Sequence, residues 1–224
     1  MSNLNSLVDT FASPVVVFNR IKENTLSAWI PLLILVAATA GVSFWYFLSI
    51  DLYQFMEASM IMSGQEVNPE ELSQILQAEA IIRWSSASIG AVATLVVYLI
   101  IALYFFLMSM LVAEDKIGFG RWMAVVAWGS LPSLISLISI AVSYAMVTPG
   151  FELFQALDKT SVASIMGLSF DDANFNVLST LTLGTVWAYV LYGLGFKVLT
   201  RCKPITAVVV GVVPALIQFG LMSL

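Results

Sequence analysis

Five serines recur at steps of three or four residues along one apolar stretch of the chain, a spacing that places side chains on one face of an α-helix. They are Ser130, Ser133, Ser136, Ser139 and Ser143. A second apolar stretch carries Thr185, Tyr189 and Tyr192 at similar steps. Two interpretations stay open. Small residues let neighbouring helices pack closely. Alternatively, a weakly polar crevice for a lipid headgroup or a small uncharged solute is lined by Ser133, Ser136, Thr185, Tyr189 and Tyr192.

The charged residues best placed for chemistry are Glu114, Asp115 and Arg121, which share one loop between two apolar stretches. Paired carboxylates could bind a cation or a partner's basic residue, although solvated helix ends often carry such pairs. The chain has no histidine and a single cysteine, Cys202, so it can form neither a Ser–His–acid triad nor an intrachain disulfide. It also lacks a nucleophile elbow, a phosphate-binding loop and a zinc-protease motif. We therefore predict a protein that is not an enzyme and that uses no cofactor and no metal.

The first 25 residues have the pattern of two short amphipathic helices. Apolar residues at positions 4, 7, 8 and 11 share one helical face. Ser13 and Pro14 then have the residue types of an N-cap and a first helical position, and a second helix is predicted from Val15 to Lys22. We expect this pair to lie flat on the membrane, with a frayed tail as the alternative. The candidate membrane or partner contacts are Leu4, Leu7, Phe11, Phe18, Arg20, Glu114, Asp115 and Arg121.

The composition excludes an ordinary soluble domain. The 224 residues are 60% hydrophobic and 10% charged, with a mean hydropathy of +0.95, whereas soluble domains are about 25% charged. A helix needs about 20 apolar residues to cross a bilayer. Five stretches qualify, at residues 26–50, 85–112, 122–147, 177–199 and 205–224. The predicted fold is an all-α integral membrane protein: one domain, residues 1–224, with a five-helix transmembrane bundle behind an interfacial amphipathic segment, residues 1–25.

Basic residues collect on one side of the predicted spans. Seven of the nine Lys and Arg residues fall on the side of the N-terminus, and the other two are Arg83 and Lys159. Short loops rich in Lys and Arg stay in the cytoplasm. The N-terminus is therefore predicted to be cytoplasmic, and an odd number of spans places the C-terminus outside. The net charge of −5 provides no basic field for nucleic acid.

The predicted loops and spans carry a few local signals. In the loop between the first two spans, Asn68 is a good N-cap, and its helix is predicted to continue through Ile82 into the second span. Apolar residues between the third and fourth spans suggest short helices on the outer membrane surface. Pro132 and Pro214 are predicted to kink the third and fifth spans.

Three segments occur in an order that resembles a known family. In the first, a proline and an aromatic precede a short amphipathic stretch, Phe11 to Ile21. The second has proline after an aromatic-rich entry, Arg121 to Pro132. The third is Val186 to Lys197, which a basic turn and a final apolar helix follow. This layout is similar to that of the bacterial branch of the Yip (Ypt-interacting protein) domain family.

The resemblance implies five spans, a cytoplasmic N-terminus, a periplasmic C-terminus and an inner-membrane location, with no assigned activity and no catalytic residues. Eukaryotic members are linked to Rab-type GTPases, but their long cytosolic N-terminal regions are not matched by the roughly 25 residues before the first span here. We predict a non-enzymatic protein that organises membrane or partner proteins. The alternative is a carrier that moves a lipid or an uncharged small molecule through the crevice. Expected partners are membrane lipids, with another membrane protein or a second copy of the chain as open alternatives.

Overall fold

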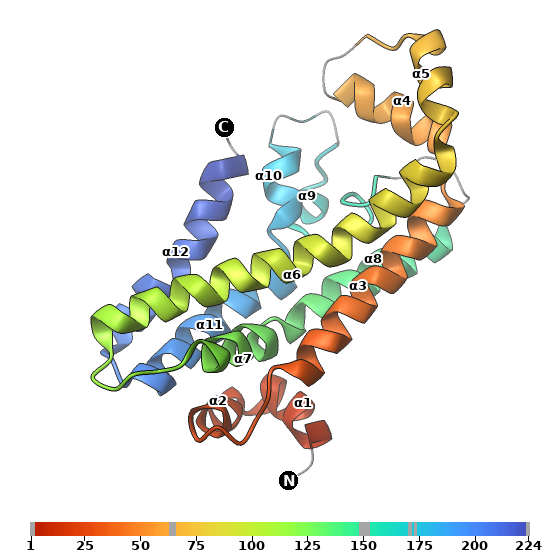
Figure 1. The fold of residues 1–224 in the computed structure, drawn as a ribbon. Helices are drawn as coiled ribbons and strands as arrows, with labels where there is room; N and C mark the ends of the chain where they lie inside the picture. Colours follow the sequence, from red (N-terminus) through yellow and green to blue (C-terminus); the bar gives the residue numbers. More distant parts are fainter. Residues whose placement is uncertain (1–2, 63–65, 148–152, 170–171, 173, 223–224) are drawn as a thin grey trace. The chain divides into compact units, whose positions relative to one another are not determined.

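The computed structural model describes residues 3–62, 66–147, 153–169, 172 and 174–222, and all named elements in this part of the chain are helices (Figure 1). In chain order they are α1 (Asn3–Ala12), α2 (Pro14–Lys22), α3 (Trp29–Ser49), α4 (Leu52–Met62), α5 (Pro69–Leu76), α6 (Glu79–Val112), α7 (Phe119–Gly129), the 3-10 helix η1 (Leu131–Ser133), α8 (Leu134–Met146), α9 (Val162–Ile165), α10 (Phe175–Thr180), α11 (Leu183–Thr200) and α12 (Pro204–Met222).

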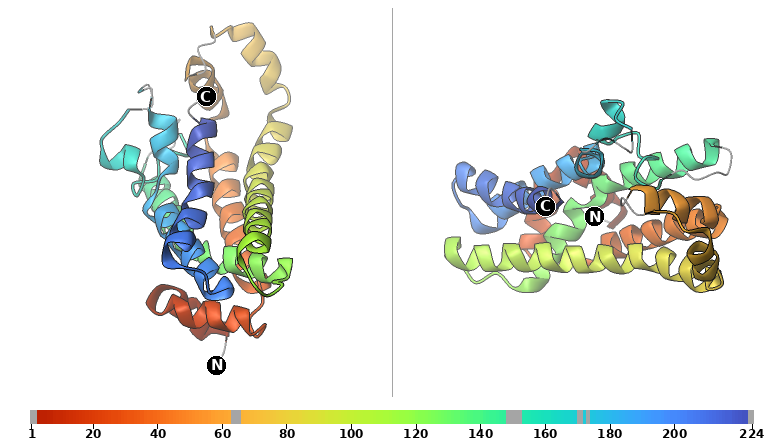
Figure 2. Two further views of the ribbon diagram at one scale, coloured as in Figure 1. Left: turned by 90° about the vertical axis from the view of Figure 1, so that its left-hand side faces the viewer. Right: turned by 90° about the horizontal axis from the view of Figure 1, so that it is seen from above.

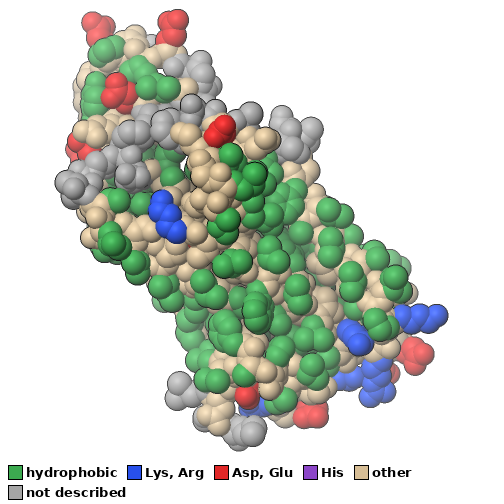
Figure 3. Space-filling model, turned by 180° about the vertical axis from the view of Figure 1, so that it is seen from behind, with side chains coloured by type: hydrophobic (Ala, Val, Ile, Leu, Met, Phe, Trp, Pro, Cys, Tyr) green, Lys and Arg blue, Asp and Glu red, His purple; other side chains and the backbone are tan. Residues whose placement is uncertain are grey.

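Four helical stretches among the described residues are long and apolar enough to cross a membrane. They are α3, α6, the stretch from α7 to α8, and α11. Hydrophobic side chains such as Ile100 and Val190 are exposed along them, and the face shown in Figure 3 is largely hydrophobic. The apolar part of α12 whose side chains the structure describes, Pro204–Gly220, is shorter than these. The fifth predicted span therefore stays a prediction.

The chain forms two compact units, and the first comprises Met1–Val36, Thr94–Leu134 and Leu183–Leu224. Its core centres on α7, which is buried from Ala124 to Gly129 and packs against α11 and α2. Helices α11 and α12 lie side by side. A Cβ at Gly211 would lie 2.7 Å from the Cα of Gly193, so two glycines let these backbones touch. Figure 2 (left) shows α1 and α2 crosswise at the ends of the long helices of this unit.

The second unit comprises Ala37–Ala93 and Ile135–Thr182. Its buried cluster is smaller than that of the first unit, and several aromatic rings pack on it. The cluster consists of Tyr46, Ile50, Ile140, Tyr144 and Leu157, with Phe47, Phe55 and Phe154 packed on them. Arg83 in α6 donates to the carbonyl oxygens of Phe47 and Ile50, at 2.7 and 2.9 Å. Because the last carbonyls of a helix have no partner within it, this arginine completes the end of α3.

The α-helix is interrupted at Pro132, the position where a kink was predicted. Proline has no N–H and cannot continue the ladder of the preceding turn, and the helix changes to η1 between α7 and α8. Pro214 instead lies inside α12, which continues on both sides of it.

The prediction of one continuous helix over residues 177–199 was wrong. Helix α10 ends at Thr180 and α11 begins at Leu183, because Leu181 is extended, with φ −85° and ψ 93°. Its carbonyl accepts a hydrogen bond from the Val162 N–H at 2.8 Å, and Thr182 pairs with Ser161 in an isolated bridge. The apolar run is therefore interrupted by a contact with residues 161–162, and a local sequence pattern does not predict such a contact.

The prediction that the helix capped by Asn68 continues through Ile82 into the second span was also wrong. Asn68 accepts a hydrogen bond from the Glu70 N–H at 3.0 Å and so caps α5 as expected. However, α5 ends at Leu76, and a turn separates it from α6, which begins at Glu79. Helix α4 was not predicted at all.

Candidate functional site

Helix α2 belongs to the protein core. Its residues Val17, Phe18 and Ile21 are buried and pack in the cluster formed with α7 and α11. A glycine, Gly195 of α11, leaves room for the Phe18 ring, since a Cβ there would lie 3.1 Å from its Cε1 atom. Phe18 was grouped with the candidate membrane or partner contacts, but its side chain is fully covered. It is therefore a packing residue.

The turn that ends α2 has the geometry of a Schellman motif. Asn24 adopts φ +59°, its N–H donates to the carbonyl of Ile21, and the N–H of Thr25 donates to the carbonyl of Arg20. Asparagine is among the few non-glycine residues that enter this left-handed region readily. The turn leads the chain into the linker before α3. There the buried Trp128 of α7 donates its indole N–H to the Ser27 carbonyl at 2.9 Å.

Helix α1 buries its polar face and exposes its apolar face, the reverse of the usual arrangement in a folded protein. Its small polar residues Ser6 and Thr10 are fully buried, and Arg20 of α2 donates a hydrogen bond to the Ser6 hydroxyl. Its apolar residues Val8 and Phe11 are 67% and 42% exposed. Leu7 is partly buried against the core. The side chain of Leu4 lies outside the described residues.

The charged candidates separate into two groups. Glu114 and Asp115 are exposed in the loop between α6 and α7. Arg121 is half-buried in the first turn of α7. In the part of the chain that the structure describes, the single ion pair joins Arg83 and Glu79, so the Arg121 guanidinium is not paired with a described carboxylate.

Lys22 lies at the end of α2 and donates to the carbonyl of Val198 at 3.0 Å. Its pKa lies below the usual 10.5, first because burial disfavours the ammonium and second because Arg201 repels it, while Asp115 acts in the opposite direction. The end of α2, the end of α11 and the α6–α7 loop are thus electrostatically coupled.

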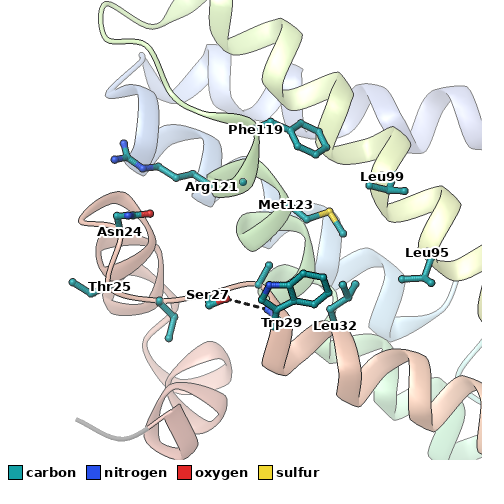
Figure 4. Close-up of a pocket in the computed structure, with 13 residues that line it drawn as sticks. Asn24, Thr25, Ser27, Trp29, Leu32, Leu95, Leu99, Phe119, Arg121 and Met123 are labelled. Carbon is teal, nitrogen blue, oxygen red and sulfur yellow. Dashed lines mark hydrogen bonds between the residues drawn. The ribbon is translucent and has the colours of Figure 1, made fainter.

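A groove of about 770 Å³ lies beside these elements in the first unit. Figure 4 shows Trp29 and Leu32 from α3, Leu95 and Leu99 from α6, and Phe119 and Met123 from α7 around it. Asn24, Thr25 and Ser27 of the linker, with Arg121, supply polar groups. Arg121 is the one charged residue among the thirteen that line this groove.

The residues of the predicted intramembrane crevice are occupied by contacts within the protein. The hydroxyls of Ser130 and Tyr192 share a hydrogen bond, Ser133 donates to the Ser130 carbonyl, and Tyr189 donates to Gln218 of α12. Thr185 is half-buried in the first turn of α11.

The backbones of the third and fourth predicted spans touch at one point. A Cβ at Gly184 would lie 2.6 Å from the Pro132 carbonyl oxygen, so η1 and α11 are in direct contact. In the second unit, Ser136 donates to the Thr182 hydroxyl at 2.8 Å. At these positions the small and hydroxyl residues make contacts within the protein, as the close-packing interpretation expects.

Comparison with known families decides the class of the protein. The family model for the Yip1 domain matches residues 8–224, nearly the whole chain. The chain belongs to the Yip1 domain family. Together with the apolar helices of sufficient length, this membership makes it a membrane protein with several spans. No curated protein and no solved structure matched the chain.

Sequence reasoning found Arg121 in this Yip1-family protein but not the groove that it borders. The lining residues come from three segments that are far apart in the chain, 24–32, 95–99 and 119–123, so no local pattern joins them. One signal was available, since Trp29 begins a span and tryptophan is enriched at membrane interfaces.

Proposed function

We propose that this Yip1-family protein works without catalysis and organises membrane or partner proteins through the outward apolar face of α1. One observation carries the proposal: α1 buries Ser6 and Thr10 and exposes Val8 and Phe11. In a helix covered by water the apolar side would be the buried one. An exposed apolar face on a fixed helix is stabilised by lipid or by another protein, at about 25 cal/mol per Å² of apolar surface covered.

The anchoring of α1 supports this reading. Arg20 of α2 bonds to Ser6, and α2 is itself fixed in the core by Phe18 and Ile21. A frayed tail would have no such attachment. The apolar face is consequently presented in one orientation, which favours a repeated, specific contact over transient association.

The proposed orientation follows from charge. The cations Arg20, Lys22 and Arg121, with those at the end of α11, belong to the side of the N-terminus, and cytoplasmic loops carry an excess of such residues. The proposed contact surface is thus cytoplasmic, on an inner membrane, with the C-terminus on the other side.

Neither of the other functions considered gains support from the site. An enzyme would need Glu114, Asp115 and Arg121 gathered in a cleft, yet both carboxylates are exposed in their loop. A carrier would need open space lined by the serine and tyrosine hydroxyls, yet Ser133 and Tyr192 bond within the first unit and Gly184 touches the Pro132 backbone.

The test is native extraction into lipid nanodiscs, followed by stoichiometric identification of every protein and lipid that leaves with the chain. We compare the intact chain with Val8→Ser/Phe11→Ser, which removes the exposed apolar face without touching the core. The matched control is Ile61→Ser, which removes one apolar residue of α4 whose exposed fraction, 59%, lies between those of Val8 and Phe11.

We expect a component present in stoichiometric amount with the intact chain and with Ile61→Ser, and reduced at least fivefold with the double variant. If the double variant leaves with the same components in the same amounts, α1 is not the contact surface. Both variants should elute as the intact chain does, because none of the changed side chains is buried.

A further inference from the structure

We propose that the groove beside Arg121 is a binding site for an anionic glycerophospholipid, with the lipid phosphate at Arg121 and the upper part of an acyl chain over Leu95 and Leu99. The proposed lipid site does not depend on the proposed contact surface of α1, because α1 contributes no residue to the groove. The two ideas can therefore fail separately.

The chemistry of the lining changes from one end of the groove to the other. In Figure 4, Asn24 and Arg121 lie at one end, and Leu95 and Leu99 lie at the other. Most of the apolar wall comes from α3 and α6, two helices able to span the membrane, with Phe119 and Met123 of α7 between the two ends, whereas the polar side chains come from the linker 24–28 and from Arg121. This division matches a molecule that has a polar head and a hydrocarbon chain.

The positive charge at the polar end of the groove favours a lipid headgroup with a negative charge. Arg121 is the one charged lining residue, and the guanidinium is not paired with a carboxylate among the described residues. A guanidinium donates two parallel hydrogen bonds to a phosphate. Gly118, which precedes α7, has no side chain to cap that helix, so the positive end of the α7 dipole adds to the same potential.

The size and position of the groove suit a lipid that enters from the bilayer. A volume of about 770 Å³ lies within the range of ligand sites and can hold a headgroup with the first part of a chain, while the rest of the lipid stays in the bilayer. Trp29 lines the groove and is 68% exposed at the first turn of α3. Tryptophan at the start of a span marks the headgroup level.

The test uses native mass spectrometry of the full chain released from nanodiscs that contain phosphatidylcholine and phosphatidylglycerol in known proportion. The measured quantity is the ratio of the two lipids that remain bound. Arg121→Gln removes the proposed phosphate contact, and Leu99→Trp fills the apolar end. Lys203→Gln is the matched control, since it removes one exposed cation that does not line the groove.

The intact chain should retain phosphatidylglycerol above its proportion in the nanodisc. Arg121→Gln should lower that enrichment about fivefold, as expected for the loss of one interfacial cation, and Lys203→Gln should change it less than twofold. Leu99→Trp should lower the total bound lipid while the protein stays monodisperse.

Three results would overturn the proposal. The first is equal retention of both lipids by the intact chain. The second is the same loss with Lys203→Gln as with Arg121→Gln, which would mean a general surface attraction. The third is full retention with Leu99→Trp, which would place the lipid elsewhere.

Discussion

Helices α1 and α2 have similar amphipathic sequences and opposite environments. Phe18 of α2 is fully buried against α11, whereas Phe11 of α1 is 42% exposed. The difference lies in the residues that each helix meets. Gly195 of α11 leaves room for the Phe18 ring of α2, whereas α1 turns Ser6 and Thr10 inward, and the Ser6 hydroxyl accepts a hydrogen bond from Arg20. An apolar helical face thus predicts that something apolar will cover it, but not whether the cover is the protein, a lipid or a partner.

The largest expected effect compares the two phenylalanines. Phe18→Ala should lower the free energy of unfolding by about 3–5 kcal/mol, because it leaves a cavity in the core. Phe11→Ala should change it by less than about 0.5 kcal/mol, since an exposed ring makes few internal contacts. Denaturant titration of both variants in bicelles measures the difference. Equal losses would mean that α1 is packed in the core as α2 is.

The glycine that receives Phe18 gives the next effect. Gly195→Ala should destabilise the protein by about 1–3 kcal/mol through overpacking, because the added Cβ would lie 2.7 Å from Val125 Cγ1 and 3.1 Å from the Phe18 ring. The control is Gly41→Ala in α3, where an added Cβ would meet no atom within 4 Å beyond its chain neighbours and its own helical turns and alanine favours the helix. The same titration applies. An unchanged midpoint for Gly195→Ala would contradict this packing.

Breaking the attachment of α1 to α2 should have a smaller effect than the two core substitutions, and the effect should be confined to α1. Ser6→Ala removes the hydroxyl that accepts from Arg20, at a loss of about 1.5 kcal/mol. Hydrogen exchange should become about tenfold faster in α1 and stay unchanged in α2. Ser13→Ala is the matched control, because the Ser13 side chain makes no capping bond. Faster exchange in both helices would show that they open as one unit.

The smallest effect concerns Lys22 at the end of α2. Asp115→Asn should lower its pKa further, and Arg201→Gln should raise it, because the two charges act in opposite directions. A lowered pKa means that the ammonium destabilises the folded state below that pKa, so stability should rise as the pH increases toward 10.5. NMR titration of isotope-labelled lysine measures both shifts. Shifts of the same sign would contradict the coupling.

Much of the architecture was predictable from local pattern. The long apolar runs that became α3, α6, α7–α8 and α11 were each recognised, because a membrane-crossing helix must satisfy its own backbone hydrogen bonds and needs about 20 apolar residues. The break at Pro132 was also predictable, because proline lacks the N–H that a helix requires. The break at Leu181 was not, since it depends on a hydrogen bond from Val162, nineteen positions earlier in the chain.

The candidate site likewise has one part that the sequence could predict and another that it could not. Arg121 could be selected from its type and position alone, and the order of motifs resembled the Yip family, which the family match then showed. The groove could not be selected, because Asn24, Leu99 and Met123 become neighbours only when three segments pack. The crevice residues were chosen for their spacing, yet spacing does not reveal that Ser133 already donates to the Ser130 carbonyl.

The sequence by itself determined that this protein is a helical membrane protein and which helices are amphipathic, because these properties depend on composition and on a period of 3.6 residues. The tertiary structure decided which amphipathic face is covered, where apolar runs break and which distant side chains share a groove. Those outcomes depend on contacts between segments far apart in the chain, such as Phe18 against Gly195, and no local period encodes them.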